Sequence, residues 1–202
     1  MGNKGTQEKD FDITSGGLLR YKIKRSNRKT IGLEITKEGL LVRAPLRASK
    51  KDIERVVNNH QEWIREKTVQ MEQTTAAASE KGLLSQEDIY RLAEEAMRYI
   101  PERVAYYAPQ LGVRPGRITI RNQKTRWGSC SKKGNLNFNC LLMMAPGEVI
   151  DSVVVHELCH LIEMNHSAKF YEQVLRVFPD YYKHHAWLKE NGPEIMARGH
   201  GG

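Results

Sequence analysis

The stretch PGEVIDSVVVHELCH, residues 146–160, decides the fold of the larger part of this chain. Its apolar residues recur at the spacing of a helix: Ile150, Val153, Val154, Leu158 and, just beyond, Leu161. The β-branched run Val153–Val155 disfavours a helix, but burial of an apolar stripe outweighs this weak preference. We therefore predict a buried helix that begins near Pro146 and carries His156 and His160 one turn apart on the same face.

Histidines four residues apart on a helix can bind one metal ion, and His156 and His160 have this spacing. Glu157 lies close to the same face and can accept a proton from a metal-bound water. A catalytic zinc site usually has three protein ligands, and His166 follows His160 beyond the expected end of the helix. Three neutral imidazoles favour Zn²⁺, although iron, cobalt or nickel could bind by affinity alone. The predicted site has His156, His160 and His166 as metal ligands and Glu157 as catalytic general base.

Two other interpretations of this stretch stay open. An ordinary amphipathic helix can carry the same pattern by chance, with two exposed histidines; the apolar helix and the third histidine argue against this. Cys159 could also approach a metal, but we interpret it as a small buried thiol. The residues that could stabilise a transition state are candidates by type alone: Tyr171, Tyr181, Tyr182, His184, His185 and Arg126.

Two short strands are predicted before this helix. Residues 117–121 and 134–142 alternate apolar and polar side chains. The polar residues of the second strand are Asn135, Asn137 and Asn139. We expect this strand to pair with an extended substrate, with its asparagines facing a cleft or solvent. A polar loop at 124–133 connects the strands, and a helix that begins near Ser85 precedes them.

The N-terminal third of the sequence is typical of a small β module. Residues 11–46 alternate apolar and polar side chains, many of them basic, around a turn at 37–39, which predicts an antiparallel sheet. A helix from about Ser49 to Met71 follows. Residues 71–85 lack apolar periodicity and are rich in small and polar side chains, as linkers are.

These elements predict an α+β fold in two modules, which suits a chain of 202 residues. Residues 1–70 form a basic β-rich module with a helix, and residues 71–85 form a linker. Residues 86–202 form the second domain, in which helices pack on a short antiparallel sheet.

Composition excludes several classes of protein. Hydrophobic residues make up 40% and charged residues 28% of the chain, close to the average of globular proteins. No apolar stretch is long enough to cross a membrane, and no apolar run follows Met1, so we expect neither a membrane protein nor a secretory signal. Three cysteines do not make a disulfide framework, and reduced thiols fit a cytoplasmic protein.

The positive charge is concentrated near the N-terminus. Residues 1–70 hold 16 Lys and Arg against 9 Asp and Glu, whereas residues 71–202 hold 16 against 15. The basic residues between Gly16 and Leu33 are Arg20, Lys22, Lys24, Arg25, Arg28 and Lys29. The alternative function is therefore a nucleic-acid-associated binding protein whose zinc site is structural or vestigial. A solvated basic face on small strands is the plainer interpretation.

Residues 124–192 resemble the YgjP-like metallopeptidase family, relatives of the SprT-like zincins. The motifs that carry the resemblance are RWGSC at 126–130, GNLN at 134–137, VVHELCHL at 154–161, NHS at 165–167, Phe170, PDY at 179–181 and WLK at 187–189. The N-terminal part is also similar, at Arg25-Ser26, Gly39, Ala44-Pro45 and Trp63-Ile64. Tyr171 departs from the family, where relatives often carry Trp.

The resemblance implies a zincin-like metallopeptidase domain with three histidine ligands, a glutamate base and a protein or peptide substrate. Hydrolysis of a non-protein amide on the same zinc stays open as a third function. The resemblance to SprT-like proteases, some of which act on DNA-bound proteins, also leaves open a basic module that recruits substrate to the peptidase. The sequence indicates no oligomeric state.

Overall fold

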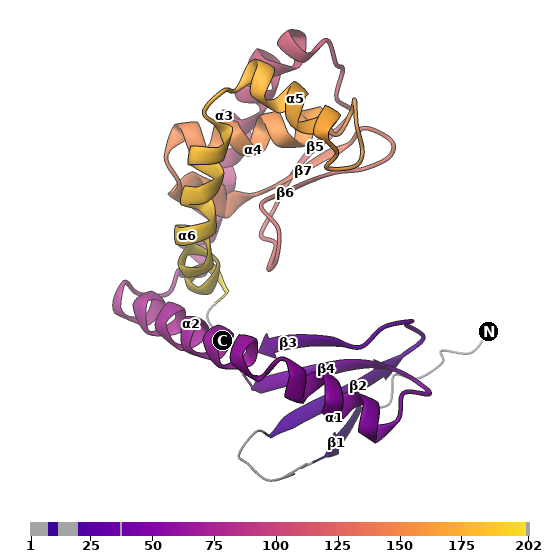
Figure 1. The fold of residues 1–202 in the computed structure, drawn as a ribbon. Helices are drawn as coiled ribbons and strands as arrows, with labels where there is room; N and C mark the ends of the chain where they lie inside the picture. Colours follow the sequence, from indigo (N-terminus) through magenta and orange to yellow (C-terminus); the bar gives the residue numbers. More distant parts are fainter. Residues whose placement is uncertain (1–7, 12–19, 37, 201–202) are drawn as a thin grey trace, which may run out of the picture. The chain divides into compact units, whose positions relative to one another are not determined.

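The computed structural model of the chain describes residues 8–11, 20–36 and 38–200 (Figure 1). The chain divides into two compact units, residues 1–74 and 75–202. The boundary between them lies within helix α2 (Gln61–Glu80). Residues 12–19, part of the predicted alternating stretch, lie outside the described residues.

The first unit contains a four-stranded sheet with α1 (Lys50–Asn59). Its strands β1 (Glu8–Phe11), β2 (Tyr21–Ser26), β3 (Gly32–Thr36) and β4 (Gly39–Pro45) lie in the order β1-β2-β4-β3. The predicted β3–β4 hairpin is present, and its Gly39 has a φ of 104°, which favours glycine. The expectation of a wholly antiparallel sheet is wrong, because β2 and β4 are parallel. The chain forms β3 at the sheet edge before β4 returns alongside β2.

The core of the first unit follows the predicted alternation. One face of β2 and β4 is buried, together with side chains of α1 and α2: Tyr21, Ile23, Leu40, Val42, Ala44, Ile53, Val57 and Ile64. The alternate residues of these strands, Lys22 and Arg43 among them, are exposed or half-buried. The apolar face of the sheet therefore holds this unit together.

The helix expected from Ser49 to Met71 is two helices, separated at His60. The His60 backbone leaves the helical region, and its ring Nδ1 lies 2.7 Å from the Val56 carbonyl oxygen, so the side chain satisfies a carbonyl at the end of α1. The predicted linker at 71–85 is for the most part helical, since α2 continues to Glu80. Its Ala, Gln and Glu residues are strong helix formers even without apolar periodicity.

A three-stranded sheet lies in the second unit. Its strands are β5 (Ile118–Arg121), β6 (Gly128–Cys130) and β7 (Leu136–Asn139), in the order β5-β7-β6. β6 pairs antiparallel with β7, but β5 pairs parallel with it, so the expected antiparallel sheet is mixed. The predicted loop at 124–133 contains β6. The predicted strand at 134–142 ends at Asn139 and continues as a 3₁₀ helix, η1 (Cys140–Met144).

This topology corrects one expectation about substrate pairing. β7 is the central strand, paired on both sides, and therefore has no free edge for another chain. β6 pairs only with β7 among the described residues and lies at the edge of the sheet.

The helix predicted at residues 146–160 is α4 (Gly147–Cys159), and ten of its 13 residues are buried. It packs against α3 (Gln86–Leu111), α5 (Ala168–Val177), α6 (Tyr181–Gly199) and β6. A helix that is apolar on all sides is stable only when it is enclosed in this way. Burial thus overrides the β-branched run, as expected.

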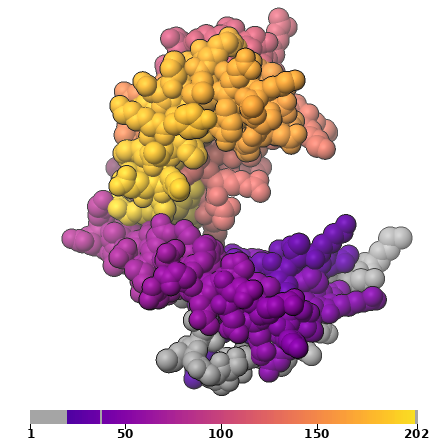
Figure 2. Space-filling view, viewed as in Figure 1, coloured from indigo at the N-terminus to yellow at the C-terminus, as the bar shows by residue number. Residues whose placement is uncertain are grey.

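The helices around α4 begin and end at recognisable signals. Ser85 and Asp88 form the capping box of α3, and Gly112, with a φ of 70°, ends this helix. Ser167 caps α5, which buries Phe170 and Val174 against the core. The side chains of α5 and α6 cover much of the face of this unit that Figure 2 shows.

The predicted α+β class is confirmed: each unit combines helices with a small sheet. Among the described residues, no helix has the length and apolar character that a transmembrane span needs.

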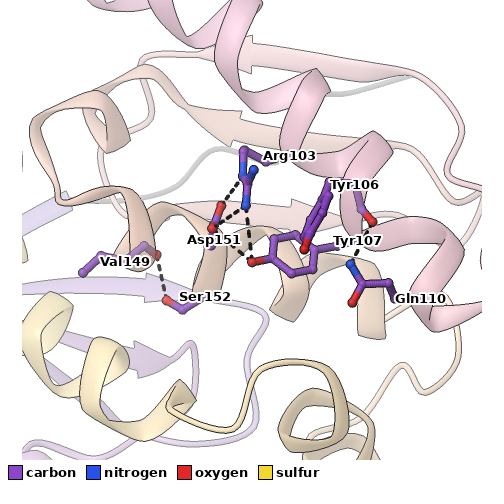
Figure 3. Close-up of polar contacts among 7 residues, drawn as sticks. All are labelled: Arg103, Tyr106, Tyr107, Gln110, Val149, Asp151 and Ser152. Atoms are coloured by element: carbon purple, nitrogen blue, oxygen red, sulfur yellow. Dashed lines mark hydrogen bonds and ion pairs between the residues drawn. The ribbon is translucent and has the colours of Figure 1, made fainter.

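A charged contact fixes α4 against α3 (Figure 3). Arg103 of α3 donates from two nitrogens to the two carboxylate oxygens of Asp151, each over 2.7 Å, and Tyr107 donates to Asp151 Oδ2 over 3.0 Å. Asp151 is only 8% exposed. Bidentate, charge-assisted bonds of this kind offset the cost of burying the carboxylate.

Arg103→Ala is expected to lower the free energy of unfolding by about 2–3 kcal/mol, because it leaves a buried carboxylate with one neutral partner. Denaturant unfolding followed by circular dichroism measures this loss. The matched control is Arg91→Ala on the same helix, since the Arg91 side chain is 72% exposed where it pairs with Asp88 and such pairs contribute under about 1 kcal/mol. Equal midpoints for the two variants would contradict the role given to Arg103.

Candidate metal centre and active site

The three predicted ligands lie together. His156 is in the last turn of α4, and His160 follows its final residue with backbone angles still in the helical region. The chain then turns back, and His166 meets both rings at centroid distances of 4.9 and 4.8 Å. One nitrogen from each histidine falls within 4.8 Å of the others. The end of α4 and the turn that follows it thus bring the three histidines together.

Hydrogen bonds orient two of the imidazoles. His160 Nδ1 lies 3.2 Å from the Glu163 carbonyl oxygen, which can only accept, so Nδ1 carries the proton. His156 Nδ1 lies 2.8 Å from the hydroxyl of Tyr181, at the start of α6. These contacts engage the Nδ1 atoms, so the Nε2 atom of each ring is the one that can bind a metal ion. Partners of this kind are typical of metal-binding histidines.

The donor set fits a zinc ion. His156 Nε2 and His166 Nε2 are 3.0 Å apart. Two nitrogens on one tetrahedral zinc, each at about 2.0–2.1 Å, would be separated by roughly 3.3 Å. Burial and the neighbouring histidines lower the pKa of His156 to about 3, and burial also lowers that of His160. Both rings are therefore neutral near pH 7, as metal ligands must be.

Phe170 of α5 supports the cluster from the protein side. Its ring centroid lies 4.9, 4.6 and 4.9 Å from those of His156, His160 and His166. Phe170 has no exposed surface, so it forms an apolar contact shared by all three rings. This packing restricts their rotation and preorganises the nitrogens.

Glu157 is nearly enclosed, with 5% of its surface exposed. Burial raises the pKa of its carboxyl group to about 8, and the positive charge of Arg126 opposes this shift. The backbone of β6 passes directly over the carboxylate: a Cβ built on Gly128 would lie 2.6 Å from Glu157 Oε1 and 2.7 Å from its Cγ. Only glycine allows β6 and Glu157 to approach this closely.

A cavity of about 270 Å³ opens beside Glu157 and His156. Its walls come from three segments: residues 125–128, the C-terminal half of α4, and one face of α6. Three of the six candidates for transition-state stabilisation line it, namely Arg126, Tyr181 and His185, whereas Tyr171, Tyr182 and His184 do not. The Tyr181 hydroxyl is bonded to His156. Arg126 and His185, both exposed, therefore remain as candidates for transition-state stabilisation in the cavity.

Asn139 does not face a cleft or solvent, contrary to expectation, whereas Asn135 and Asn137 are half-buried. Asn139 is fully buried, and its Nδ2 donates to the carbonyl oxygens of Gln123 and Arg126 over 2.7 and 3.0 Å. Its backbone N–H donates to Trp127. Asn135 accepts from the backbone of Arg117. These bonds fix the segment before β6, and no cleft-facing role is left for Asn139.

Sequence reasoning missed three residues of the site. Tyr181 was a candidate by type alone, although it contacts a ligand histidine. Gly128 was quoted only as part of a motif, and Asn139 was assigned to the wrong environment. Because each acts across a tertiary contact, no local pattern could identify its role. Cys159, in contrast, is fully buried as predicted, and burial raises the pKa of its thiol to about 12.

Comparisons with known proteins give a family match and similar solved structures. The YgjP-like metallopeptidase domain model matches residues 29–93 and 90–191. The metallopeptidase zymogen abylysin of Pyrococcus abyssi is 23% identical, with a TM-score of 0.41 over 45% of this chain and 93% of that chain. The zymogen jannalysin of Methanocaldococcus jannaschii is 21% identical, with a TM-score of 0.42 over 46% and 97%. Among curated proteins, none matches significantly.

The family match extends from residue 29 to residue 191 of the 202-residue chain. It includes most of the first unit and all four residues of the candidate site. The resemblance stated from the sequence is thereby confirmed: the chain belongs to the YgjP-like metallopeptidase family.

Proposed function

We propose that this chain is a zinc-dependent peptidase in which His156, His160 and His166 hold the metal and Glu157 is the general base. The observation that carries the proposal is the convergence of three imidazoles beside a buried carboxylate on one enclosed helix. Membership of a metallopeptidase family supports the reaction class. Three nitrogen donors leave a fourth position open, as in catalytic zinc sites.

Zinc bound there supplies a Lewis acid that polarises a carbonyl group and makes water a stronger nucleophile near neutral pH. The protein residues provide the proton transfer. Glu157, adjacent to the ligand His156, accepts the proton of the attacking water at its carboxylate. It then delivers that proton to the nitrogen of the leaving amine as the peptide C–N bond breaks.

The free edge of β6 offers a place for the peptide backbone. Pairing of an extended peptide with an edge strand would align it by main-chain hydrogen bonds. Gly128, at the start of β6, lies against Glu157, so a peptide on this edge passes close to the general base. We therefore assign the role first expected of β7 to β6.

Among residues 8–11, 20–36 and 38–74 of the N-terminal unit, no observation favours nucleic-acid binding. Arg25 donates to the carbonyl oxygens of Pro45, Leu46 and Ala48 over 2.8–3.2 Å. Lys22 pairs with Glu38 and Arg43 with Glu34. Arg25, Lys22 and Arg43 thus have partners within the unit.

One zinc per purified chain is expected, measured by atomic emission. Glu157→Gln should keep the zinc and lower peptide cleavage about 10²–10⁴-fold, because it removes the proton acceptor. His166→Ala should lose both the zinc and the activity. His184→Ala, outside the cluster, should keep both. A folded wild-type chain that takes up no metal would overturn the proposal.

Tyr181→Phe should weaken zinc binding about 10–100-fold, because it removes the hydroxyl that orients His156. Competition with a chelating dye measures the affinity. Tyr182→Phe is the matched control, since Tyr182 is 56% exposed and its ring packs on Tyr181 and Tyr171, whereas the hydroxyl bonded to His156 belongs to Tyr181. An unchanged dissociation constant for Tyr181→Phe would show that this hydrogen bond has no such role.

Gly128→Ala should lower kcat about 10–100-fold with zinc retained, because the new methyl group displaces the Glu157 carboxylate or β6. Steady-state kinetics and metal analysis together test this. Ser129→Ala, the next position of β6, serves as the control and should cleave peptides nearly as well as the wild type. Wild-type turnover by Gly128→Ala is the contrary result.

A further inference from the structure

His166 differs from the other two predicted ligands in its hydrogen bonds. His156 Nδ1 is bonded to the Tyr181 hydroxyl, and His160 Nδ1 to the Glu163 carbonyl oxygen. The His166 side chain contacts only His156 in this way, through the two Nε2 atoms, and no residue in the described part of the chain bonds to its Nδ1. His166 is also the most exposed of the three. The orientation of its ring therefore depends on contacts of another kind.

Two rings from the first turn of α5 contact the His166 imidazole. This helix begins directly after Ser167, which caps it, so its first residues follow His166 closely in the chain. Phe170 meets the imidazole at a centroid distance of 4.9 Å, with an angle of 80° between the ring planes. Tyr171 stacks on it at 6.3 Å and 30°. Phe170 contacts all three histidines, whereas the ring of Tyr171 contacts His166 alone among them.

The Tyr171 ring is itself held in place. Tyr182, near the start of α6, stacks on it at 5.9 Å and 29°, and Tyr181 contacts it at 6.3 Å and 51°. Tyr171 is half-buried and packs against the core of the second unit. Its hydroxyl makes no hydrogen bond with any residue that the structure describes, and Tyr171 does not line the cavity beside Glu157. The contacts of Tyr171 are therefore those of its ring.

We propose that Tyr171 is a positioning residue for the third metal ligand: by stacking on His166, its ring holds the imidazole in the orientation that binds the ion. This inference rests on the proposed function, in which His166 is a ligand. Stacked rings at these distances attract one another. The stack restricts the rotation of an exposed side chain before the metal arrives, so binding costs less conformational entropy. Tyr171 thus does for His166 what the Tyr181 hydroxyl does for His156.

The first test measures the zinc affinity of the full chain by competition with a chelating dye. Tyr171→Leu keeps an apolar side chain but removes the ring, and it should weaken zinc binding about 2–10-fold, the range that an aromatic pair contributes. Tyr171→Phe keeps the ring and should restore the wild-type affinity. Tyr99→Leu is the matched control, because Tyr99 is also half-buried and packs on the same core without a ring contact to the three histidines. It should leave the zinc affinity unchanged.

The second ring of the stack gives a graded effect. Tyr182→Leu removes the ring that packs on Tyr171 and should weaken zinc binding by a smaller factor than Tyr171→Leu. Tyr182 is 56% exposed, so this variant carries little risk to folding. Should Tyr171→Leu lose the circular dichroism of the folded chain, an unchanged zinc affinity in Tyr182→Leu would overturn the inference.

Nuclear magnetic resonance of the zinc-loaded chain tests the contact itself, without turnover. A stacked aromatic ring shifts the ring protons of its partner upfield, and His166→Ala identifies the His166 signals by their loss. Tyr171→Phe should keep the upfield shift of these signals, and Tyr171→Leu should remove it. His166 signals that move in neither variant would contradict the stack.

The outcomes separate this inference from the proposed function. Wild-type zinc affinity in His166→Ala would reject His166 as a ligand, and with it the proposed metal site. Loss of zinc from His166→Ala with unchanged affinity in a folded Tyr171→Leu would reject the positioning role alone. A lower kcat or a higher KM in Tyr171→Phe, with zinc retained, would also reject it, because the hydroxyl would then act on the substrate.

Discussion

The enclosure of α4 on all sides is the constraint on which the rest of the structure depends. Ten of its 13 residues are buried, and α3, α5, α6 and β6 surround it. An enclosed helix cannot turn about its axis without moving close-packed side chains on every face. Packing of α4 therefore sets the directions in which His156 and Glu157 leave the helix, and the Tyr181 hydroxyl and the Phe170 ring then orient the His156 imidazole.

The surroundings of α4 complete the site with residues distant in sequence. α6 supplies Tyr181 to His156, one of the three proposed ligands, and α5 supplies Phe170, which packs on all three rings. Gly128 lets β6 approach Glu157, and Gly192 makes room for the Trp127 ring. At both positions a larger residue would collide with the neighbouring side chain. The residues proposed for the chemistry are close together in the sequence, whereas the residues that position them come from distant segments.

This division explains how much the sequence could predict. The four predicted site residues lie within eleven consecutive positions: His156, Glu157, His160 and His166. Helical periodicity and one turn were therefore enough to predict that they lie together. The sheets were harder, because alternation shows which face is buried but gives neither strand order nor direction. Both parallel pairs, β2–β4 and β5–β7, were missed for this reason. The helix through residues 71–80 was missed because it is formed by propensity without an apolar stripe.

The two buried acidic side chains of α4, Asp151 and Glu157, differ in their hydrogen-bond partners. Asp151 is held by a bidentate arginine and a tyrosine, so its charge is compensated within the fold. Glu157 is buried to a similar extent, yet no described residue donates a hydrogen bond to its carboxylate. Burial without such partners raises the pKa of the Glu157 carboxyl to about 8, so the fold by itself favours the neutral form of this group. The three imidazoles that we propose as metal ligands lie next to this carboxyl group, and a cation bound by them would favour its ionised form. The adjoining cavity would give a substrate access to it. The same helix therefore carries Asp151, whose ionised form is stabilised by Arg103 and Tyr107 and which holds α4 against α3. It also carries Glu157, whose ionised form has no such stabilisation and which we propose as the general base.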